Sequence, residues 1–138
     1  MIRKGPSEVE ILRTLSGGAS LKIISSIANG AMRTSEFSNR KDVSSKQYYS
    51  RTAQMIKKGL IRRDKGRLFL TSLGKISYHS LLKIDYAIRN YWKLKAIDSM
   101  QDSSEMRRDE RTRIIKTIIG NDKKILRIFE NQFSSNRI

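Results

Sequence analysis

Basic side chains gather in one stretch of this sequence, and their chemistry is the binding of negatively charged groups. Between residues 40 and 67 the chain carries ten Lys or Arg and only two acids, Asp42 and Asp64. This stretch therefore has a net charge of +8, which is half of the +16 of the whole chain. Because such a concentration of cations attracts polyanions, it favours nucleic acid as a partner. An anionic membrane attracts cations too, so charge alone does not decide between the two.

A helix is predicted to hold four of these cations. Ser44 and Gln47 have the spacing of a capping box, and the helix that they begin ends at Gly59. Steps of 100° per residue divide this helix into sides. The side expected to face the protein carries Tyr48, Thr52, Met55 and Ile56. The opposite side, which could enter a groove, carries Lys46, Tyr49, Ser50, Ala53 and Lys57. The edges, suited to phosphates, carry Gln47, Arg51, Gln54 and Lys58.

A β-hairpin is predicted directly after this helix. Residues 60–63 and 67–70 flank Asp64, Lys65 and Gly66, and Gly66 can supply the positive φ that a tight turn needs. Leucines of both strands are placed to anchor the hairpin to the core: Leu60, Leu68 and Leu70. The cations that cluster on this small hairpin are Arg62, Arg63, Lys65 and Arg67.

Short helices are predicted before this region. Ser7 and Glu10 form a capping box for a helix that stops at Gly17-Gly18. A second helix runs from about residue 20 to 31, and its buried face carries Leu21, Ile23, Ile24, Ile27, Ala28 and Ala31. Thr34 or Ser35 can then cap a short helix that carries Phe37 inward, followed by a turn at residues 41–43 with Val43 in the core.

Helices also fill the second half of the chain. Thr71-Ser72 begins one long helix that reaches Trp92 and extends towards Met100. A break is predicted at residues 102–105, and the helix after it carries apolar residues between Ile114 and Ile119. This helix stops at residues 120–122. The apolar residues of the last helix are Ile125, Leu126, Phe129 and Phe133. We therefore divide the chain into a binding region, 1–75, and a helical region, 76–138, that serves as a scaffold or a dimer interface.

No catalytic or metal site is predicted. The chain has no Cys and a single His, His79, without partners of metal-ligand spacing. Gly17-Gly18 lacks the Gly-Lys-Ser/Thr of a phosphate loop, and helix capping explains Ser44 and Ser45 better than nucleophilic catalysis does. The sequence therefore predicts no enzyme, no cofactor and no metal. Trp92 with Tyr86 and Tyr91 could line a small-molecule pocket, but a dimer core is the favoured interpretation.

The sequence also predicts where the protein is found. It has no apolar run of the ~18 residues that a membrane span needs, and its first residues lack a signal-peptide core. We therefore expect a cytoplasmic protein, associated with the nucleoid and without a membrane partner.

Three runs resemble the winged helix-turn-helix transcriptional regulators of the ArsR and MarR type, especially their archaeal relatives. They are ILRTLSGGASLKIISSIANG, TSEFS and SSKQYYSRTAQMIKKGLIRRDKGRLFLTSLGK, which together span about residues 8–78. The resemblance implies a mainly α fold with a small β-hairpin wing, and C-terminal helices that form a homodimer. It also implies sequence-specific binding to double-stranded DNA.

The resemblance assigns roles to individual residues. The helix 45–58 would enter the major groove, and the wing, 61–70, would contact the flanking backbone or minor groove. Bases or their phosphates would be contacted by Ser45, Lys46, Gln47, Tyr49, Ser50 and Ala53, with Arg51 and Lys57 beside them. The wing would be held to the duplex by Arg62, Arg63, Lys65 and Arg67. The homodimer would form through the helix 72–100 and the C-terminal helices.

Two other functions remain open at this point. An architectural protein could coat DNA with little sequence specificity, and a winged-helix module could dock onto other proteins. The residues after about 100 match no effector domain of the family, and the chain lacks the Cys and His clusters of its metal sensors. The operator, the direction of regulation and any small-molecule effector are not predicted.

Overall fold

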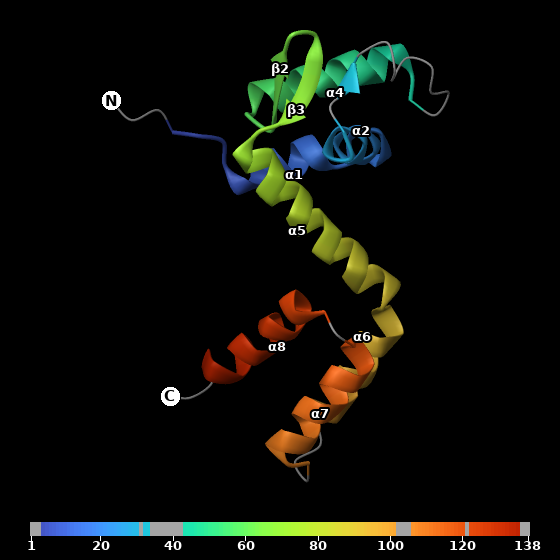
Figure 1. Ribbon diagram of the computed structural model, residues 1–138, viewed down its shortest axis with the longest axis vertical. Coiled ribbons are helices and arrows are strands. Elements are labelled where there is room, and N and C mark those ends of the chain that lie inside the picture. The colour runs from blue at the N-terminus through green and yellow to red at the C-terminus, as the bar shows by residue number, and fades with distance from the viewer. Residues whose placement is uncertain (1–3, 31, 34–42, 102–105, 121, 136–138) are drawn as a thin grey trace. The chain divides into compact units, whose positions relative to one another are not determined.

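The chain forms helices and one small antiparallel sheet, as a computed structural model shows (Figure 1). The structure describes residues 4–30, 32–33, 43–101, 106–120 and 122–135. It divides into two compact units, Met1–Leu81 and Leu82–Ile138. The boundary between the two units lies inside a helix. It comes six residues after the predicted boundary between residues 75 and 76. The mainly helical class is confirmed, and a small antiparallel hairpin is present as predicted.

Helices pack around the sheet in the described part of the first unit. α1 spans Glu8–Leu15, α2 spans Gly18–Ala28 and α4 spans Ser45–Lys57. The capping box of α1 is confirmed, because the Ser7 hydroxyl accepts from the Glu10 amide and the Glu10 carboxylate accepts from the Ser7 amide. Asn29 caps the end of α2 as expected.

The sheet has three strands in the order β1-β3-β2. β2, Ile61–Asp64, and β3, Arg67–Leu70, form the predicted hairpin, and β1, Met32–Arg33, pairs with the other edge of β3. The hairpin turn is Lys65-Gly66, with φ values of 49° and 77°. Positive φ at both positions is typical of a type I′ turn, whose twist matches that of the strands. The sequence predicted Gly66 in this role but not the strand β1.

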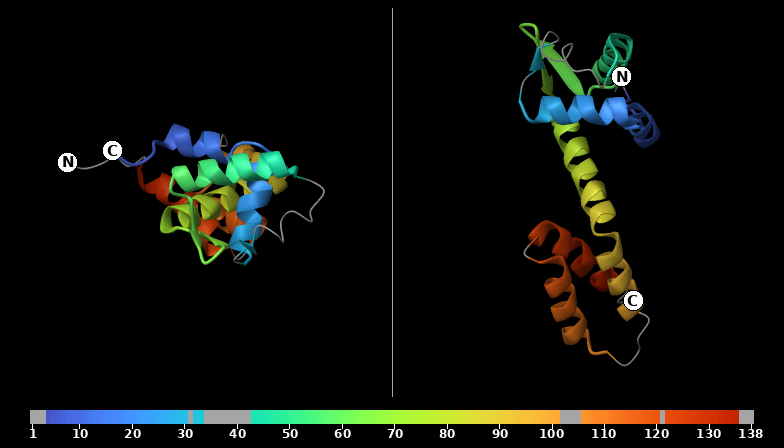
Figure 2. Two further views of the ribbon diagram at one scale, coloured as in Figure 1. Left: turned by 90° about the horizontal axis from the view of Figure 1, so that it is seen from above. Right: turned by 90° about the vertical axis from the view of Figure 1, so that its right-hand side faces the viewer.

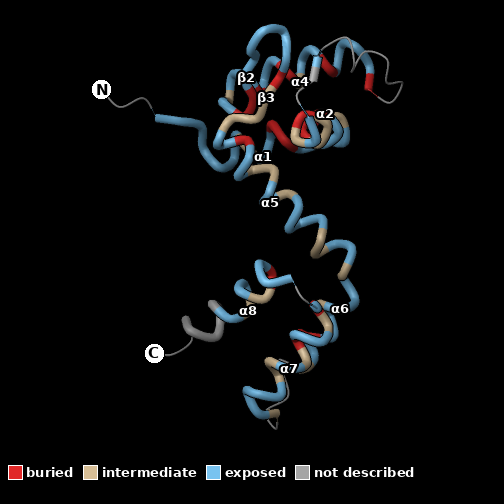
Figure 3. The backbone as a smooth tube through the Cα atoms, in the orientation of Figure 1, coloured by how far each residue is buried: buried red, intermediate tan, exposed pale blue. Residues whose placement is uncertain are grey.

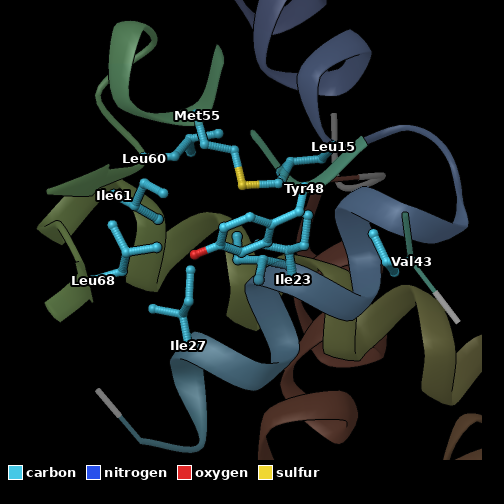
Figure 4. Close-up of a cluster of buried hydrophobic side chains, with 10 residues drawn as sticks. Leu15, Ile23, Ile27, Val43, Tyr48, Met55, Leu60, Ile61 and Leu68 are labelled. Atoms are coloured by element: carbon cyan, nitrogen blue, oxygen red, sulfur yellow. The ribbon is translucent and has the colours of Figure 1, made fainter. Parts of the chain in front are cut away.

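One apolar core joins the three helices and the sheet of the first unit (Figures 3 and 4). Its buried residues are Leu15, Ile23, Ile24, Ile27, Val43, Tyr48, Met55, Leu60, Ile61 and Leu68. Figure 4 shows the Tyr48 ring in the middle of this cluster. The predicted anchoring by Leu60 and Leu68 is confirmed, and Leu70 is half-buried against the core. Leu21, expected on the buried face of α2, is instead 41% exposed.

The predicted long helix is two helices. α5 spans Ser72–Arg89 and α6 spans Tyr91–Gln101. Asn90 lies between them, and its side-chain amide donates to the Tyr86 carbonyl oxygen at 2.9 Å. Such a side-chain bond competes with the helical hydrogen-bond ladder, which explains why Asn is unfavourable inside a helix. No helix in the described part of the chain is both long and apolar enough to cross a membrane.

A second apolar cluster holds the second unit together. α6 packs against α7, Arg108–Ile119, and α7 packs against α8, Lys123–Ser135 (Figure 2). The buried residues are Ile97, Ile115, Ile119 and Ile125. Gly120 ends α7 with a φ of 78°, and the Asp122 carboxylate caps α8 by accepting from two backbone amides, as predicted.

Tyr86 ties the end of α5 into this cluster. Its hydroxyl lies 3.5 Å from the Ile119 carbonyl oxygen. Burial raises the pKa of Tyr86, and the negative charge of Asp122 raises it further. Tyr91 and Trp92 are exposed, whereas Tyr86 is half-buried.

Several predictions fall on parts of the chain outside the described residues. They are the short helix with Phe37, the turn residues Lys41 and Asp42, the break at residues 102–105, and the side chain of Phe133.

Gly74 lets α5 approach the hairpin closely. A Cβ atom at this position would lie 1.9 Å from the Leu60 carbonyl oxygen. The Thr71 hydroxyl fixes the same junction, because it donates to the Gly59 carbonyl oxygen, lies 3.1 Å from the Leu60 carbonyl oxygen and accepts from the Gly74 amide at 3.0 Å. Thr71 is thus the cap of α5, as predicted. The residues Leu70-Thr71-x-x-Gly74 therefore fix where α5 leaves the sheet.

We predict that Gly74→Ala lowers the free energy of unfolding by about 2–3 kcal/mol, because the methyl group forces the backbone apart. Urea denaturation followed by circular dichroism measures this. Gly18→Ala is the matched control, since nothing lies within 4 Å of its added Cβ and Ala favours the helix α2. Equal stability of the two variants would contradict the close approach.

Candidate nucleic-acid interface

One side of α4 is fixed in the core. The capping box at its start is confirmed: the Gln47 amide donates to the Ser44 hydroxyl at 3.2 Å, and the Gln47 side-chain oxygen accepts from the Ser44 amide at 3.4 Å. Tyr48, Thr52 and Met55 are at most 4% exposed. These buried side chains set the rotation of α4 about its axis and therefore decide which residues it presents outward.

The other side of α4 carries the predicted groove residues. Tyr49 is 59% exposed, and its ring meets the edge of the buried Tyr48 ring at 5.4 Å between centroids. The remaining predicted residues on this helix that are exposed are Ser45, Lys46, Gln47, Ser50, Ala53 and Lys57. Arg51 is half-buried, as expected for an edge position. The structure thus brings these residues together on one accessible side of one helix.

One expectation for α4 is corrected. Ile56 was expected to face the core but is 38% exposed, because its direction lies at the margin of the buried side. Lys58, expected at the edge, is half-buried like Arg51 and pairs with Glu10 of α1 at 3.7 Å between charged atoms. This ion pair connects the end of α4 with α1.

Gln47 combines a helix-capping role with the base contact predicted for it. Its side-chain oxygen belongs to the capping box, whereas reading an adenine needs the oxygen and the nitrogen of the same amide. The capping contact is long, at 3.4 Å, and exposed, so it costs little to exchange for a base. The capping box does not use the side-chain nitrogen of Gln47. This nitrogen can therefore donate a hydrogen bond to a base before the capping contact is exchanged.

The hairpin places its four cations on two faces and at the turn. Opposite residues share a face in an antiparallel pair, and the register pairs Arg63 with Leu68 and Arg62 with Phe69. Arg63 therefore lies on the same face of the hairpin as the buried Leu68, which contacts the core, and Lys65 lies at the turn. Arg62 lies on the outer face, where its guanidinium is 4.9 Å from the Phe69 ring centre and 3.7 Å from the Asp64 carboxylate. All four predicted cations are exposed.

Arg33 is a cation of this surface that sequence reasoning missed. It lies on β1 directly opposite Arg67 of β3, and Arg67 lies opposite Asp64 of β2. Arg33 therefore adds an exposed cation beside the hairpin, next to Arg67 and Asp64. Strand β1 is only two residues long and has no alternating pattern, so nothing in the sequence marks Arg33 as a neighbour of the hairpin.

Known proteins offer no direct guide to this surface. Comparisons with protein families, curated proteins and solved structures found no match. The properties of α4 and of the hairpin are therefore the basis for its function. Both belong to the first compact unit and share one core, so their exposed residues are held by the same packing.

We predict that Ser44→Ala lowers the free energy of unfolding by about 1 kcal/mol, because the first turn of α4 loses its cap. Ser45→Ala is the matched control, since Ser45 is the next residue, is exposed and is not the cap. Urea denaturation of both variants measures the difference. If Ser45→Ala were as destabilising as Ser44→Ala, the capping box would not be what begins α4.

Proposed function

We propose that this protein is a sequence-specific transcriptional regulator that binds double-stranded DNA as a homodimer. The observation that carries the proposal is α4, a helix with one side fixed in the core and an exposed side rich in polar and basic residues. A helix of this kind fits the major groove of B-DNA, and the hairpin beside it would contact the flanking backbone or minor groove.

Sequence preference is assigned to the first turns of α4. Lys46 and Gln47 have the hydrogen-bonding groups that suit guanine and adenine, and each good pair discriminates by about 1–3 kcal/mol. Tyr49 and Ser50 lie beside them and can contact a thymine methyl group, a sugar or a phosphate. Ala53, one turn further, leaves room for the close approach of a base edge.

Affinity is assigned to the cations of the sheet. Arg63 and Lys65 have no ion pair with an acid in the described part of the chain, so they are the first choice for phosphate contact. Phosphate contact releases counterions and makes binding steeply dependent on salt. Arg67 and its strand neighbour Arg33 are exposed cations that would add further phosphate contacts.

A second copy of the chain is the proposed partner of α5 and α6. Ile84, Ile88 and Tyr91 follow each other at intervals of four and three residues and are 51–69% exposed, and Trp92 is 79% exposed. This spacing is that of helices that pair along an apolar seam. A row of large apolar side chains costs free energy in water, which pairing of two copies would recover.

A low-specificity architectural protein is the second candidate. The exposed cations of the sheet favour it, because they attract any phosphate backbone irrespective of sequence. The polar residues on α4 argue for the first candidate.

In-vitro selection separates the two candidates. Purified protein is mixed with fragmented genomic DNA at near-physiological salt with excess competitor duplex, and the bound DNA is sequenced. A single enriched, roughly palindromic motif is the expected result, and its half-site spacing tests the dimer. Bound DNA without a shared motif would favour the architectural protein. No bound DNA, even at lower salt, would leave a protein-docking module as the best description.

We predict that variants on the helix and on the hairpin change binding differently. Lys46→Ala and Gln47→Ala should relax sequence preference, whereas Arg63→Ala and Lys65→Ala should weaken binding to all sequences and reduce the salt slope by about one each. Fluorescence anisotropy with selected and scrambled duplexes over a salt series measures both effects.

Two controls complete this experiment. Ser44→Ala breaks the capping box without removing the Gln47 amide, so it separates loss of base reading from loss of helix stability. Lys124→Ala removes one exposed cation from the second unit and should leave the slope unchanged. If helix and hairpin variants behaved alike, the division of roles would be wrong.

We predict that Ile88→Lys converts the protein into a monomer, because each copy would bring a charge into the apolar seam at a cost of several kcal/mol. Sedimentation equilibrium measures the mass. Leu12→Lys on α1 is the matched control, since Leu12 is 62% exposed but lies outside the proposed seam. A wild-type monomer, or a dimer that Ile88→Lys leaves intact, would overturn this interface.

A further inference from the structure

The second unit contains a hollow that the proposed function does not use. It lies between α7 and α8 and encloses about 350 Å³. Its lining residues are Lys116, Lys123, Leu126, Arg127 and Glu130. This volume falls at the lower end of the range for sites that bind small molecules.

Basic side chains surround this hollow. Lys116 comes from the last turn of α7, Lys123 is the first residue of α8, and Arg127 lies one turn further along α8. None of the three has an ion pair with an acid in the described part of the chain. Lys123 and Arg127, four residues apart on a helix, repel each other. Even with Glu130 counted, the lining has an excess of positive charge, and an anion among these cations would relieve the repulsion.

The floor of the hollow is apolar. Leu126 lies on it, and a smaller recess of about 20 Å³ beside it is lined by Ile115, Phe129 and Thr112 as well as Leu126. The two spaces share Lys116, Leu126 and Glu130, so they adjoin each other. The recess has room for a methyl-sized group or a water molecule. Cations around an apolar floor match a ligand that has both an anionic and an apolar part.

We infer that this hollow binds a small organic anion, whose anionic head lies among Lys116, Lys123 and Arg127 and whose apolar body lies on Leu126. The Arg127 guanidinium can bind a phosphate or carboxylate through two parallel hydrogen bonds, and the two lysines add point charges. A DNA backbone would use the same cations but would leave the apolar floor without a partner. The inference concerns the second unit alone and stands whether or not the first unit binds DNA.

The test uses three probes on the full-length protein. Phenyl phosphate has head and body, inorganic phosphate has only the head, and phenol has only the body. Nuclear magnetic resonance titration should show saturable shifts for the amides of residues 116 and 123–130 with phenyl phosphate. Inorganic phosphate should bind about ten-fold or more weakly, because it lacks the apolar contact with Leu126. Phenol should cause no saturable shift.

Two neighbouring lysines give the matched variants. Lys123→Gln and Arg127→Gln should weaken phenyl phosphate binding about ten-fold or more each, as expected for lost charged hydrogen bonds. Lys124→Gln removes the same charge from the same turn of α8, but Lys124 does not line the hollow, so it should leave binding nearly unchanged. Because Lys123, Lys124 and Arg127 are all exposed, the variants should fold as the wild type does.

Three results would overturn the inference. Equal weakening by Lys123→Gln and Lys124→Gln would mean a general attraction between charges. Equal binding of inorganic and phenyl phosphate would exclude the apolar body. Displacement of phenyl phosphate by duplex DNA, together with weaker DNA binding by Lys123→Gln, would make the cations part of a DNA surface.

Discussion

The burial of one side of α4 is the constraint on which the exposed basic surface depends. Tyr48, Thr52 and Met55 are enclosed by α2 and the sheet, and burial of large side chains such as Tyr48 and Met55 contributes roughly 1.5–3 kcal/mol each. A rotation of α4 by one residue would bring Tyr49 into the core and turn its polar row away from solvent. The core therefore sets both the stability of the first unit and the side chains that it offers to a partner.

Local signals made much of this unit predictable. The capping box of Ser44 and Gln47, the helical spacing of the apolar residues and the turn at Gly66 each depend on a few neighbouring residues, and the structure has all three. The features that the sequence did not reveal depend on distant residues. Strand β1 forms because its backbone at Arg33 pairs with the backbone of β3 at Arg67, far along the chain. The exposure of Ile56 depends on which elements cover α4.

The candidate site was predictable as a set of residues but not as an arrangement. A count of charges makes Arg62, Arg63, Lys65 and Arg67 equivalent, whereas strand pairing places them on two faces and a turn. Arg62 shares its face with Phe69 and Asp64, which hold its guanidinium close to the sheet. An ion pair at an exposed position contributes little to stability, so its main effect is to orient the side chain. The four cations are thus unequal in their freedom to reach a phosphate.

The two units use positive charge in different ways, and the difference lies in what surrounds each cation. On the hairpin, exposed cations are spread over a small sheet and its turn, which suits a long partner with many separate charges. Between α7 and α8, cations surround an apolar floor, which suits one compact molecule. Binding of a long polyanion should weaken steeply with salt because many counterions are released, whereas a single anionic head on an apolar floor should be much less sensitive. Salt dependence therefore separates two kinds of site that net charge alone makes look the same.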